Sequence, residues 1–225
     1  MDWDEEPQGN HNAGILTALI DKRLEKNKEE SRAYIGASSI GHICERQIWY
    51  RYNGFEGEPI SPTLQRTFEV GKRLEDMVLD YLEEAGLELV RTWWDLKDEK
   101  NPEFQGHCDA VWRGATDAII EVKTARDSSF RIFAKQGLMK WYPIYYSQVQ
   151  GYMGMSGIKE AYVIAINKDT SELHDERVLF DEGHYHLLQQ KAQRIIDTKE
   201  VPPKVNNSPM YYVCKSCSFK TKCHS

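Results

Sequence analysis

The segment from Glu103 to Arg126 constrains the fold of this chain more than any other part of the sequence. It predicts two short strands, Phe104–Trp112 and Ala118–Thr124, joined by a turn at Arg113–Thr116. The first strand alternates loosely between apolar or small residues and polar ones. The second places a glutamate and a lysine in the middle of an apolar run, Ala-Ile-Ile-Glu-Val-Lys-Thr. Charged residues inside such a strand require a partner or a function.

The pairing of these two strands predicts a site for a divalent cation. Residues two apart in a strand share a face, so Glu121 and Lys123 are expected to point the same way. A hairpin about the turn sets Asp109 opposite Glu121. Two carboxylates, with the backbone carbonyl of Val122, are ligands that suit Mg²⁺ or Mn²⁺. A bound ion would acidify a water for attack on phosphorus, and Lys123 would position that water and pair with the phosphate. The alternative is a solvated Glu–Lys pair on an exposed strand.

Composition favours one domain with appendages in a chain of 225 residues that is 40% hydrophobic. We expect a terminal segment over 1–36 and the main domain over 37–225. No run approaches 18 apolar residues and the first six residues are acidic, which predicts a soluble, cytoplasmic protein that does not enter membranes. The net charge is −6, yet the segment 191–225 holds seven Lys and Arg against two acidic residues. A cation-dependent enzyme that acts on a polyanion can be acidic overall and basic where the substrate lies.

The order of elements predicts an α/β domain with a mixed sheet and helices on both faces. Apolar residues at helical spacing predict helices over Gly14–Glu30, Ile40–Tyr52 (capped by Ser38 or Ser39), Thr63–Ala85, Ser128–Met139, Pro143–Met155 and Glu182–Thr198. Strands in addition to the hairpin are predicted at Leu87–Leu96, Ala161–Ile166 and Leu173–Phe180.

Two of the predicted helices carry polar residues that would complete the site. Gly71 and Glu75 lie on a line that borders the apolar face of the helix over Thr63–Ala85, so Glu75 is a further candidate ligand. Gln148 and Tyr152 are four residues apart on one face of a later helix, where they could hold the attacking water or a DNA backbone. Taken singly, each pair also fits an ordinary amphipathic helix.

Together these residues resemble the PD-(D/E)XK nuclease superfamily in its RecB-like branch. The resemblance rests on four motifs in the expected order and spans about Cys44 to Cys223, with its motifs at Gly71…Glu75, Gly106-His107-Cys108-Asp109, Glu121-Val122-Lys123 and Gln148…Tyr152. It implies a restriction-endonuclease-like fold, Mg²⁺ or Mn²⁺ at Asp109 and Glu121 and also at Glu75, Lys123 as the catalytic lysine, and DNA as the substrate. Cys108 stands where the superfamily name has proline.

The five cysteines are odd in number, which disfavours a disulfide framework in a chain without a secretion signal. Cys214, Cys217 and Cys223 supply three thiolates within ten residues, one short of a closed set. Cys44 is expected to supply the fourth, and Cys108 to be a small buried hydrophobic residue. The spacing does not separate structural zinc from a [4Fe–4S] cluster. For zinc, spare nitrogen ligands are available at His42 and His224.

The chain has one cysteine before the nuclease motifs and three after them. This arrangement resembles that of the RecB-like nucleases that carry an iron–sulfur cluster. These include the CRISPR-associated adaptation exonucleases and their phage relatives. The resemblance implies a [4Fe–4S] cluster at Cys44, Cys214, Cys217 and Cys223, with a structural role that ties the C-terminal tail to the N-terminal helices. The chain length fits a stand-alone enzyme, since the sequence contains nothing like an ATPase P-loop. Self-association, or partners in recombination or CRISPR adaptation, are further expectations.

A single strand of DNA would need aromatic faces and cations along its path. The sequence offers these at Trp93-Trp94, Trp141-Tyr142, Tyr145-Tyr146 and Tyr211-Tyr212, with Lys135, Lys140, Lys215, Lys220 and Lys222. The sequence therefore predicts a metal-dependent DNA exonuclease acting on single-stranded ends. Two alternatives stay open: an endonuclease or duplex-degrading recombination exonuclease on the same fold, and a zinc-stabilised, non-catalytic DNA-binding module.

Overall fold

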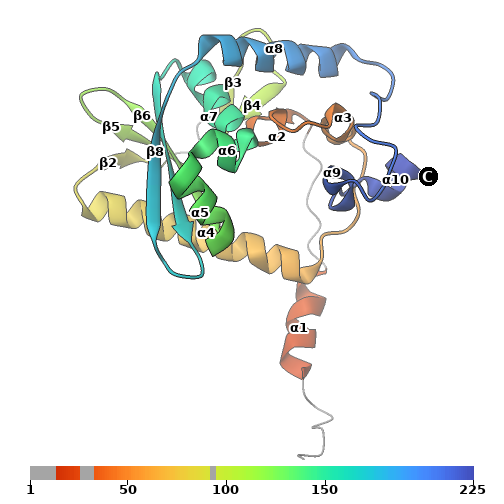
Figure 1. The fold of residues 1–225 in the computed structure, drawn as a ribbon, viewed down its shortest axis with the longest axis horizontal. Helices are drawn as coiled ribbons and strands as arrows, with labels where there is room; N and C mark the ends of the chain where they lie inside the picture. Colours follow the sequence, from red (N-terminus) through yellow and green to blue (C-terminus); the bar gives the residue numbers. More distant parts are fainter. Residues whose placement is uncertain (1–13, 26–32, 92–94) are drawn as a thin grey trace, which may run out of the picture.

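A five-stranded mixed sheet forms the centre of the structure, a computed structural model that describes residues 14–25, 33–91 and 95–225 (Figure 1). Its strands lie in the order β2–β5–β6–β7–β8, with bounds Glu88–Val90, Ala110–Arg113, Ala118–Ala125, Glu160–Asn167 and Leu173–Leu179. β6 and β7 are parallel and the other neighbours are antiparallel. The two central strands read as nearly continuous apolar runs because both of their faces are covered.

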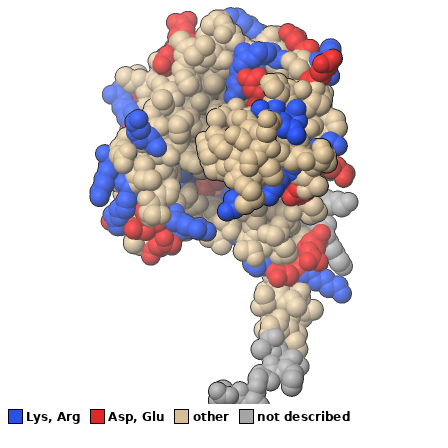
Figure 2. Space-filling view, turned by 45° about the vertical axis from the view of Figure 1, so that its right-hand side comes forward, with Lys and Arg blue, Asp and Glu red and all other residues tan. Residues whose placement is uncertain are grey.

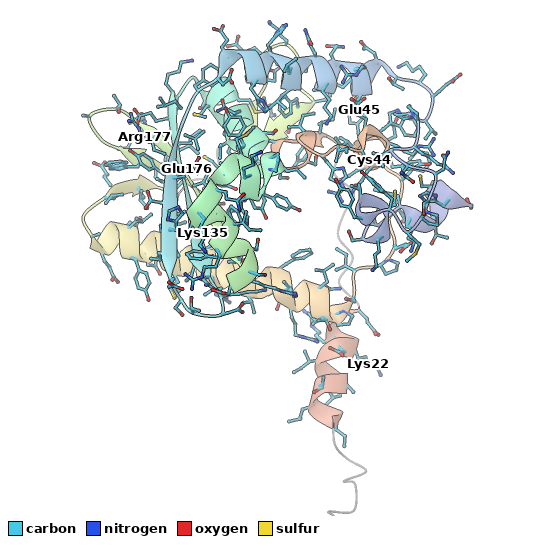
Figure 3. The ribbon with its side chains drawn as sticks, in the orientation of Figure 1. Lys22, Cys44, Glu45, Lys135, Glu176 and Arg177 are labelled. Atoms are coloured by element: carbon cyan, nitrogen blue, oxygen red, sulfur yellow. The ribbon has the colours of Figure 1, made fainter. Side chains whose placement is uncertain are left out.

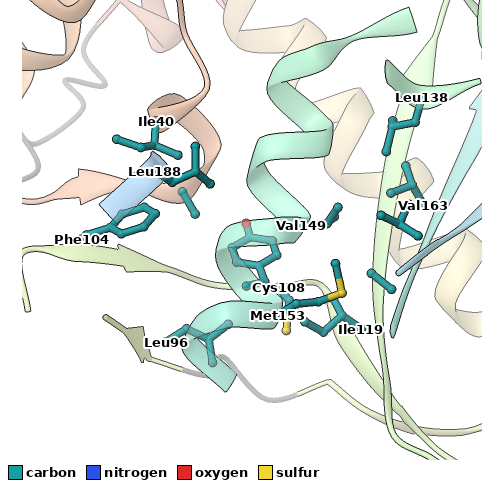
Figure 4. Close-up of a cluster of buried hydrophobic side chains, with 14 of the residues drawn as sticks. Ile40, Leu96, Phe104, Cys108, Ile119, Leu138, Val149, Met153, Val163 and Leu188 are labelled. Atoms are coloured by element: carbon teal, nitrogen blue, oxygen red, sulfur yellow. The ribbon is translucent and has the colours of Figure 1, made fainter. Parts of the chain in front are cut away.

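Helices cover both faces of this sheet, as the sequence predicted. On one face, α4 (Pro62–Glu84) packs Val78 and Leu79 in a cluster with Ile120 of β6. On the other face, α7 (Pro143–Ser156) packs Val149 and Met153 in the main core with strand residues that include Ile119 and Val163 (Figure 4). Successive residues of β6 therefore face α4 and α7 in turn, which decides the direction of every functional side chain on that strand.

The remaining elements surround this unit. They are α1 (Ile15–Leu24), β1 (Ile35–Gly36), α2 (Ala37–Ile40), α3 (Glu45–Tyr52), β3 (Leu96–Lys97), β4 (Phe104–Gly106), α5 (Asp127–Gln136), α6 (Leu138–Trp141), α8 (Glu182–Asp197), α9 (Tyr212–Lys215) and α10 (Lys220–His224). A second, smaller sheet has the order β1–β4–β3. α1 stands off the body beyond the start of α4, and α9 and α10 lie beside α3 (Figure 1). The predicted division at residue 36 stays a prediction.

The long helices and the later strands lie where the sequence predicted them. α4 begins after Ser61, whose side chain accepts a hydrogen bond from the Leu64 N–H, with Pro62 in the first turn. The positive φ of +96° at Gly86 follows its end. α7, α8, β7 and β8 agree with their predicted ranges within two residues. Of the described helices, none combines the length and apolar character that crossing a bilayer requires.

The predicted first strand of the hairpin, Phe104–Trp112, is wrong as a single strand. It divides into β4 and β5, which belong to different sheets. The chain turns out of the ladder after Gly106, which lies so close to Tyr152 of α7 that a Cβ would come within 2.5 Å of the ring. The predicted register is nevertheless confirmed, since Ala110 pairs with Ile120 and Trp112 with Ala118.

Three other predicted elements are divided or shortened. The strand over Leu87–Leu96 becomes β2 and β3, and Trp93-Trp94 lies outside the described residues. The helix over Ser128–Met139 breaks at Gly137, where φ is +79°. Of the helix over Gly14–Glu30, the described part is α1, which ends at Leu24.

The predicted helix over Ile40–Tyr52 is also wrong as one element, because the chain bends between α2 and α3. A Cβ on Gly41 would lie 2.9 Å from the Ile144 Cα, so close contact with α7 fixes this bend. Cys44 occupies the N-cap of α3. Ser39 does not cap a helix, since its hydroxyl donates to the Gly36 carbonyl at 2.9 Å.

Gly106→Ala should destabilise the protein by about 1–3 kcal/mol, because the added methyl group has no room against Tyr152. Gly71→Ala is the matched control: Gly71 lies inside α4, where an added Cβ would have no neighbour nearer than 3.7 Å, so alanine should leave stability unchanged or raise it by about 0.5–1 kcal/mol. Urea denaturation followed by circular dichroism measures both. Equal stability of Gly106→Ala and wild type would contradict the close packing of α7 on β4.

Candidate active site

Glu121 and Lys123 of β6 form a buried ion pair on the face of the sheet that α7 covers. The Lys123 Nζ donates to the Glu121 Oε1, and the two side chains, lysine and glutamate, are 16% and 2% exposed. Burial alone would lower the pKa of Lys123, but the charges of Glu121 and Asp109 outweigh it and hold that pKa above its ordinary value. The lysine therefore carries its positive charge at neutral pH.

Gln148 and Tyr152 of α7 complete the surroundings of this pair. The Gln148 Nε2 donates to the Glu121 Oε1 at 2.8 Å and to the Tyr152 hydroxyl at 2.6 Å. Their spacing of four residues brings both over β6 from one helix face, as predicted. Tyr152 is buried against Gly106, and burial raises the pKa of its hydroxyl, so it stays neutral. The amide and the phenol thereby fix the orientation of the Glu121 carboxylate.

Asp109 lies immediately before β5 and faces Glu121 across the hairpin. Its Oδ2 accepts a hydrogen bond of 2.7 Å from the Val122 N–H, which anchors the carboxylate to β6. Burial, together with the Glu121 charge, raises the pKa of Asp109 well above its ordinary value. Burial also raises the pKa of Glu121, against the opposing effect of Lys123. One positive charge does not balance two carboxylates in this buried setting.

Glu75 approaches the same carboxylates from α4. Its charge contributes to the raised pKa values of both Asp109 and Glu121, so it belongs to the same electrostatic cluster. The Lys72 Nζ lies 2.5 Å from the Glu75 Oε1 and partly balances it. The sequence predicted that Glu75 borders the apolar face of α4, and its side chain is 19% exposed.

The oxygen atoms of this cluster fit a hard divalent cation. The Glu121 Oε2 is buried and has no hydrogen-bond partner among the described residues, although such an oxygen normally has one. A cation beside it would also allow Asp109 to ionise. Within the described ranges, no three His, Cys, Asp or Glu side chains are arranged to hold an ion by themselves. An ion here would keep water ligands, as Mg²⁺ commonly does.

Four of the five cysteines line one small cavity of about 20 Å³. They are Cys44 at the N-cap of α3 (Figure 3), Cys214 of α9, Cys217, and Cys223 of α10. All four are free thiols. The structure thus brings the distant Cys44 to the three cysteines of the tail.

The protein also donates hydrogen bonds to these thiols. The Phe219 N–H lies 3.4 Å from the Cys217 Sγ, and the Arg46 Nη1 lies 3.5 Å from the Cys223 Sγ. Burial and the neighbouring thiols raise the pKa values of Cys214 and Cys217. Donors of this kind stabilise thiolate sulfurs that bind a metal or a cluster.

Cys108 lies outside this cavity, as predicted. It is buried in the main core beside α7 (Figure 4). Burial, with the charges of Glu121 and Asp109, raises the pKa of its thiol to about 12, so it behaves as a small apolar residue. The two histidines differ: His224 lines the cysteine cavity, whereas the His42 Nδ1 accepts a hydrogen bond from the Cys44 N–H.

The aromatic candidates divide into three groups. Trp141 is buried in the core, and Tyr146 packs partly against it with its ring 5.0 Å from that of His184. Tyr211 and Tyr212 form a pair on the tail. Tyr142 and Tyr145 line a second cavity together with Arg51 of α3, a residue that the sequence motifs did not single out. The only signal for Arg51 was its place on the helix that follows Cys44.

Solved structures similar to this chain include exonucleases. LHK-Exo in complex with dAMP is 17% identical with a TM-score of 0.58, over 74% of this chain and 87% of its own. LHK-Exo, an alkaline exonuclease from Laribacter hongkongensis, gives the same score at 16% identity, with the same shares of the two chains. A phage-related exonuclease from Haemophilus somnus 129PT is 16% identical with a TM-score of 0.50, over 71% of this chain and 78% of its own.

SSO0001 matches over more of the length, 96% of this chain and 98% of its own, with a TM-score of 0.53 and 18% identity. No protein-family model matches the chain, and no curated protein matches it in sequence. The chain therefore shares its fold with alkaline and phage-related exonucleases. This is the mixed α/β nuclease fold that the sequence motifs implied.

Asp109→Asn should stabilise the metal-free protein at neutral pH by about 1–3 kcal/mol. A raised pKa means that folding favours the protonated acid. Asp109 therefore makes its full contribution to the free energy of unfolding below the unfolded-state pKa of about 4. That contribution is lost as the pH rises through the folded-state pKa. The asparagine side chain carries no charge, so this loss does not occur, and its amide oxygen can still accept a hydrogen bond from the Val122 N–H.

Thermal unfolding from pH 3 to pH 8 in the presence of a chelator tests this expectation. Asp175→Asn, an exposed substitution on β8 with the same change in charge, is the control and should follow wild type. If Asp109→Asn is no more stable than this control at pH 7, the two carboxylates do not repel each other as inferred.

Proposed function

We propose that this protein is a divalent-metal-dependent DNA exonuclease that hydrolyses phosphodiester bonds, with a preference for single-stranded ends. The observation that carries the proposal is the convergence of Asp109, Glu121 and Lys123 in one buried cluster. A structural Glu–Lys pair would not need a second buried carboxylate, nor would it leave the Glu121 Oε2 without a partner among the described residues.

In this proposal Asp109 and Glu121 hold Mg²⁺ or Mn²⁺, with Glu75 and the Val122 carbonyl as further ligands. The bound ion supplies a more acidic water and neutralises charge on the phosphate oxygens. Lys123 holds its proton and offers a fixed positive charge to the substrate phosphate and the attacking water. Gln148 and Tyr152 keep the Glu121 carboxylate in one orientation, and α7 excludes bulk water from that side.

The shared fold supports a nuclease but does not by itself choose its substrate. LHK-Exo and the phage-related protein are named as exonucleases, and LHK-Exo binds dAMP in one of its structures. An endonuclease, or an exonuclease that degrades duplex DNA in recombination, would use the same residues. A non-catalytic DNA-binding module would have no use for the charged Lys123 beside two carboxylates, so we favour an enzyme. Self-association, partners in recombination or CRISPR adaptation, and a cytoplasmic location stay predictions.

We also propose that Cys44, Cys214, Cys217 and Cys223 bind a [4Fe–4S] cluster, with zinc as the alternative. Zinc would hold its thiolates about 2.3 Å from a single point. A cluster spans a wider set of sulfurs, and the hydrogen bonds to Cys217 and Cys223 suit bound sulfur. The bound group would join the tail to α3 and close a long loop of the chain.

Wild-type protein should release nucleotides from single-stranded DNA only when Mg²⁺ or Mn²⁺ is present. Asp109→Ala and Lys123→Ala should each lower the rate by about 100-fold or more. Substrates labelled at the 5′ or the 3′ end report both the activity and its direction. Lys168→Ala, which removes a lysine after β7, is the control and should cut at the wild-type rate. Unchanged cleavage by both site variants would refute the assignment of the site.

Cys44→Ala and Cys217→Ala should each empty the cysteine site and lower stability by about 3–5 kcal/mol, because the long loop opens. Iron and zinc content, visible absorption and thermal unfolding measure the result. Cys108→Ala is the control and should keep the full metal content, although it loses some core packing. Zinc at one equivalent in a colourless wild-type protein would favour the alternative, and loss of iron in Cys108→Ala would overturn the ligand set.

A further inference from the structure

A second cavity adjoins the candidate active site. It has a volume of about 270 Å³ and lies between the α2–α3 region on one side and residues of α7 on the other. This volume is just below the range of about 300–1,000 Å³ that is typical of small-molecule pockets, which leaves room for one flat group such as a nucleobase. The face of the molecule in Figure 2 is hollowed by a recess with acidic atoms inside it and with Lys and Arg side chains near its edges.

Tyr145 connects this cavity to the buried ion pair. Its ring lines the cavity, and the Lys123 Nζ lies 4.7 Å from the centre of that ring. A ligand against this wall therefore lies one side chain away from the lysine. None of the residues that hold the carboxylate cluster lines the cavity, so the cavity is an extension of the candidate site and not part of its metal-binding centre.

The cavity presents a pair of aromatic rings to its contents. The rings of Tyr142 and Tyr145 lie 4.5 Å apart, tilted by 33°. Tyr142 is 45% exposed, whereas the neighbouring Trp141 is buried in the core. Ile48 of α3 also lines the cavity. Tyr145 already packs against Tyr142 and Lys123, so the exposed ring of Tyr142 is the side of this slot on which a flat group can stack.

A fixed positive charge lies at the same cavity. Arg51 is exposed on α3, and the described residues offer its guanidinium neither an ion pair nor a hydrogen bond. Other exposed arginines of this chain do have partners, for example Arg177 with Glu160 and Arg194 with Glu45. A guanidinium that is open to a ligand, beside an aromatic slot, is the combination that recognises a base and its phosphate.

We propose that this cavity binds one nucleotide of a single strand next to the scissile phosphate, with its base stacked on the exposed ring of Tyr142 and its phosphate at Arg51. The inference deepens the proposed nuclease function and rests on it. A base inside a duplex is already stacked and paired, so it cannot enter the slot without being unpaired first. The cavity is then the element that selects single-stranded over double-stranded substrate.

Equilibrium binding without a divalent cation tests this inference separately from catalysis. The probe is a single-stranded oligonucleotide that contains 2-aminopurine, whose fluorescence falls when it stacks. Tyr142→Ala should weaken binding about fivefold or more and abolish the quenching, whereas Tyr142→Phe should retain both. Tyr81→Ala is the matched control, because Tyr81 is 50% exposed, similar to Tyr142, and lies on α4, which covers the other face of the sheet.

Salt dependence tests the phosphate contact. Arg51→Gln should lower the slope of log affinity against log salt concentration by about 0.7 for single-stranded DNA. Arg177→Gln removes the same charge from β8, on the far side of the sheet (Figure 3), and should leave the slope unchanged. Equal slopes for Arg51→Gln and wild type would overturn the phosphate contact.

The KM values of the metal-loaded enzyme complete the test. Tyr142→Ala should raise the KM for single strands about fivefold or more with little change in kcat, and should leave duplex degradation unaffected. Unchanged single-strand binding, or an equal loss on duplex DNA, would overturn the inference. Failure of the wild type to cut any DNA would instead refute the proposed function, and the binding measurements would still decide the role of the cavity.

Discussion

The buried Glu121 carboxylate is the constraint on which the rest of the structure depends. A carboxylate removed from water costs several kcal/mol unless partners surround it. Lys123 supplies the charge and Gln148 supplies a hydrogen bond, so β6 and α7 must keep one register relative to each other. The same requirement fixes Tyr152, and through it the close approach at Gly106. One oxygen of Glu121 still lacks a partner among the described residues, which leaves a defined place for a cation.

Much of this arrangement could be predicted from the sequence because it depends on local periodicity. The two-residue period of β6 predicted the shared face of Glu121 and Lys123, and the turn predicted the register with β5. The four-residue spacing in α7 predicted that Gln148 and Tyr152 act together. These rules need no knowledge of distant parts of the chain.

The predictions that were wrong all concern places where tertiary contact decides the local structure. The strand over Phe104–Trp112 divides because Gly106 must pass Tyr152, and the helix over Ile40–Tyr52 divides because Gly41 must pass α7. Neither contact leaves a sign in the local pattern beyond a glycine. Arg51 was missed for the same reason, since only the packing of α3 opposite α7 gives it a role.

The bend between α2 and α3 links the two ends of the site. His42 lines the cavity that contains Tyr142 and Arg51. Its Nδ1 accepts a hydrogen bond of 3.1 Å from the N–H of Cys44, and Cys44 lines the cysteine cavity. α3 follows directly after its N-cap, Cys44, and its residues Ile48 and Arg51 line the cavity that contains Tyr142. A group bound by the cysteines would therefore hold that wall in place. In the proposed function, a group at the cysteine site would therefore contribute through the position of α3, without chemistry of its own.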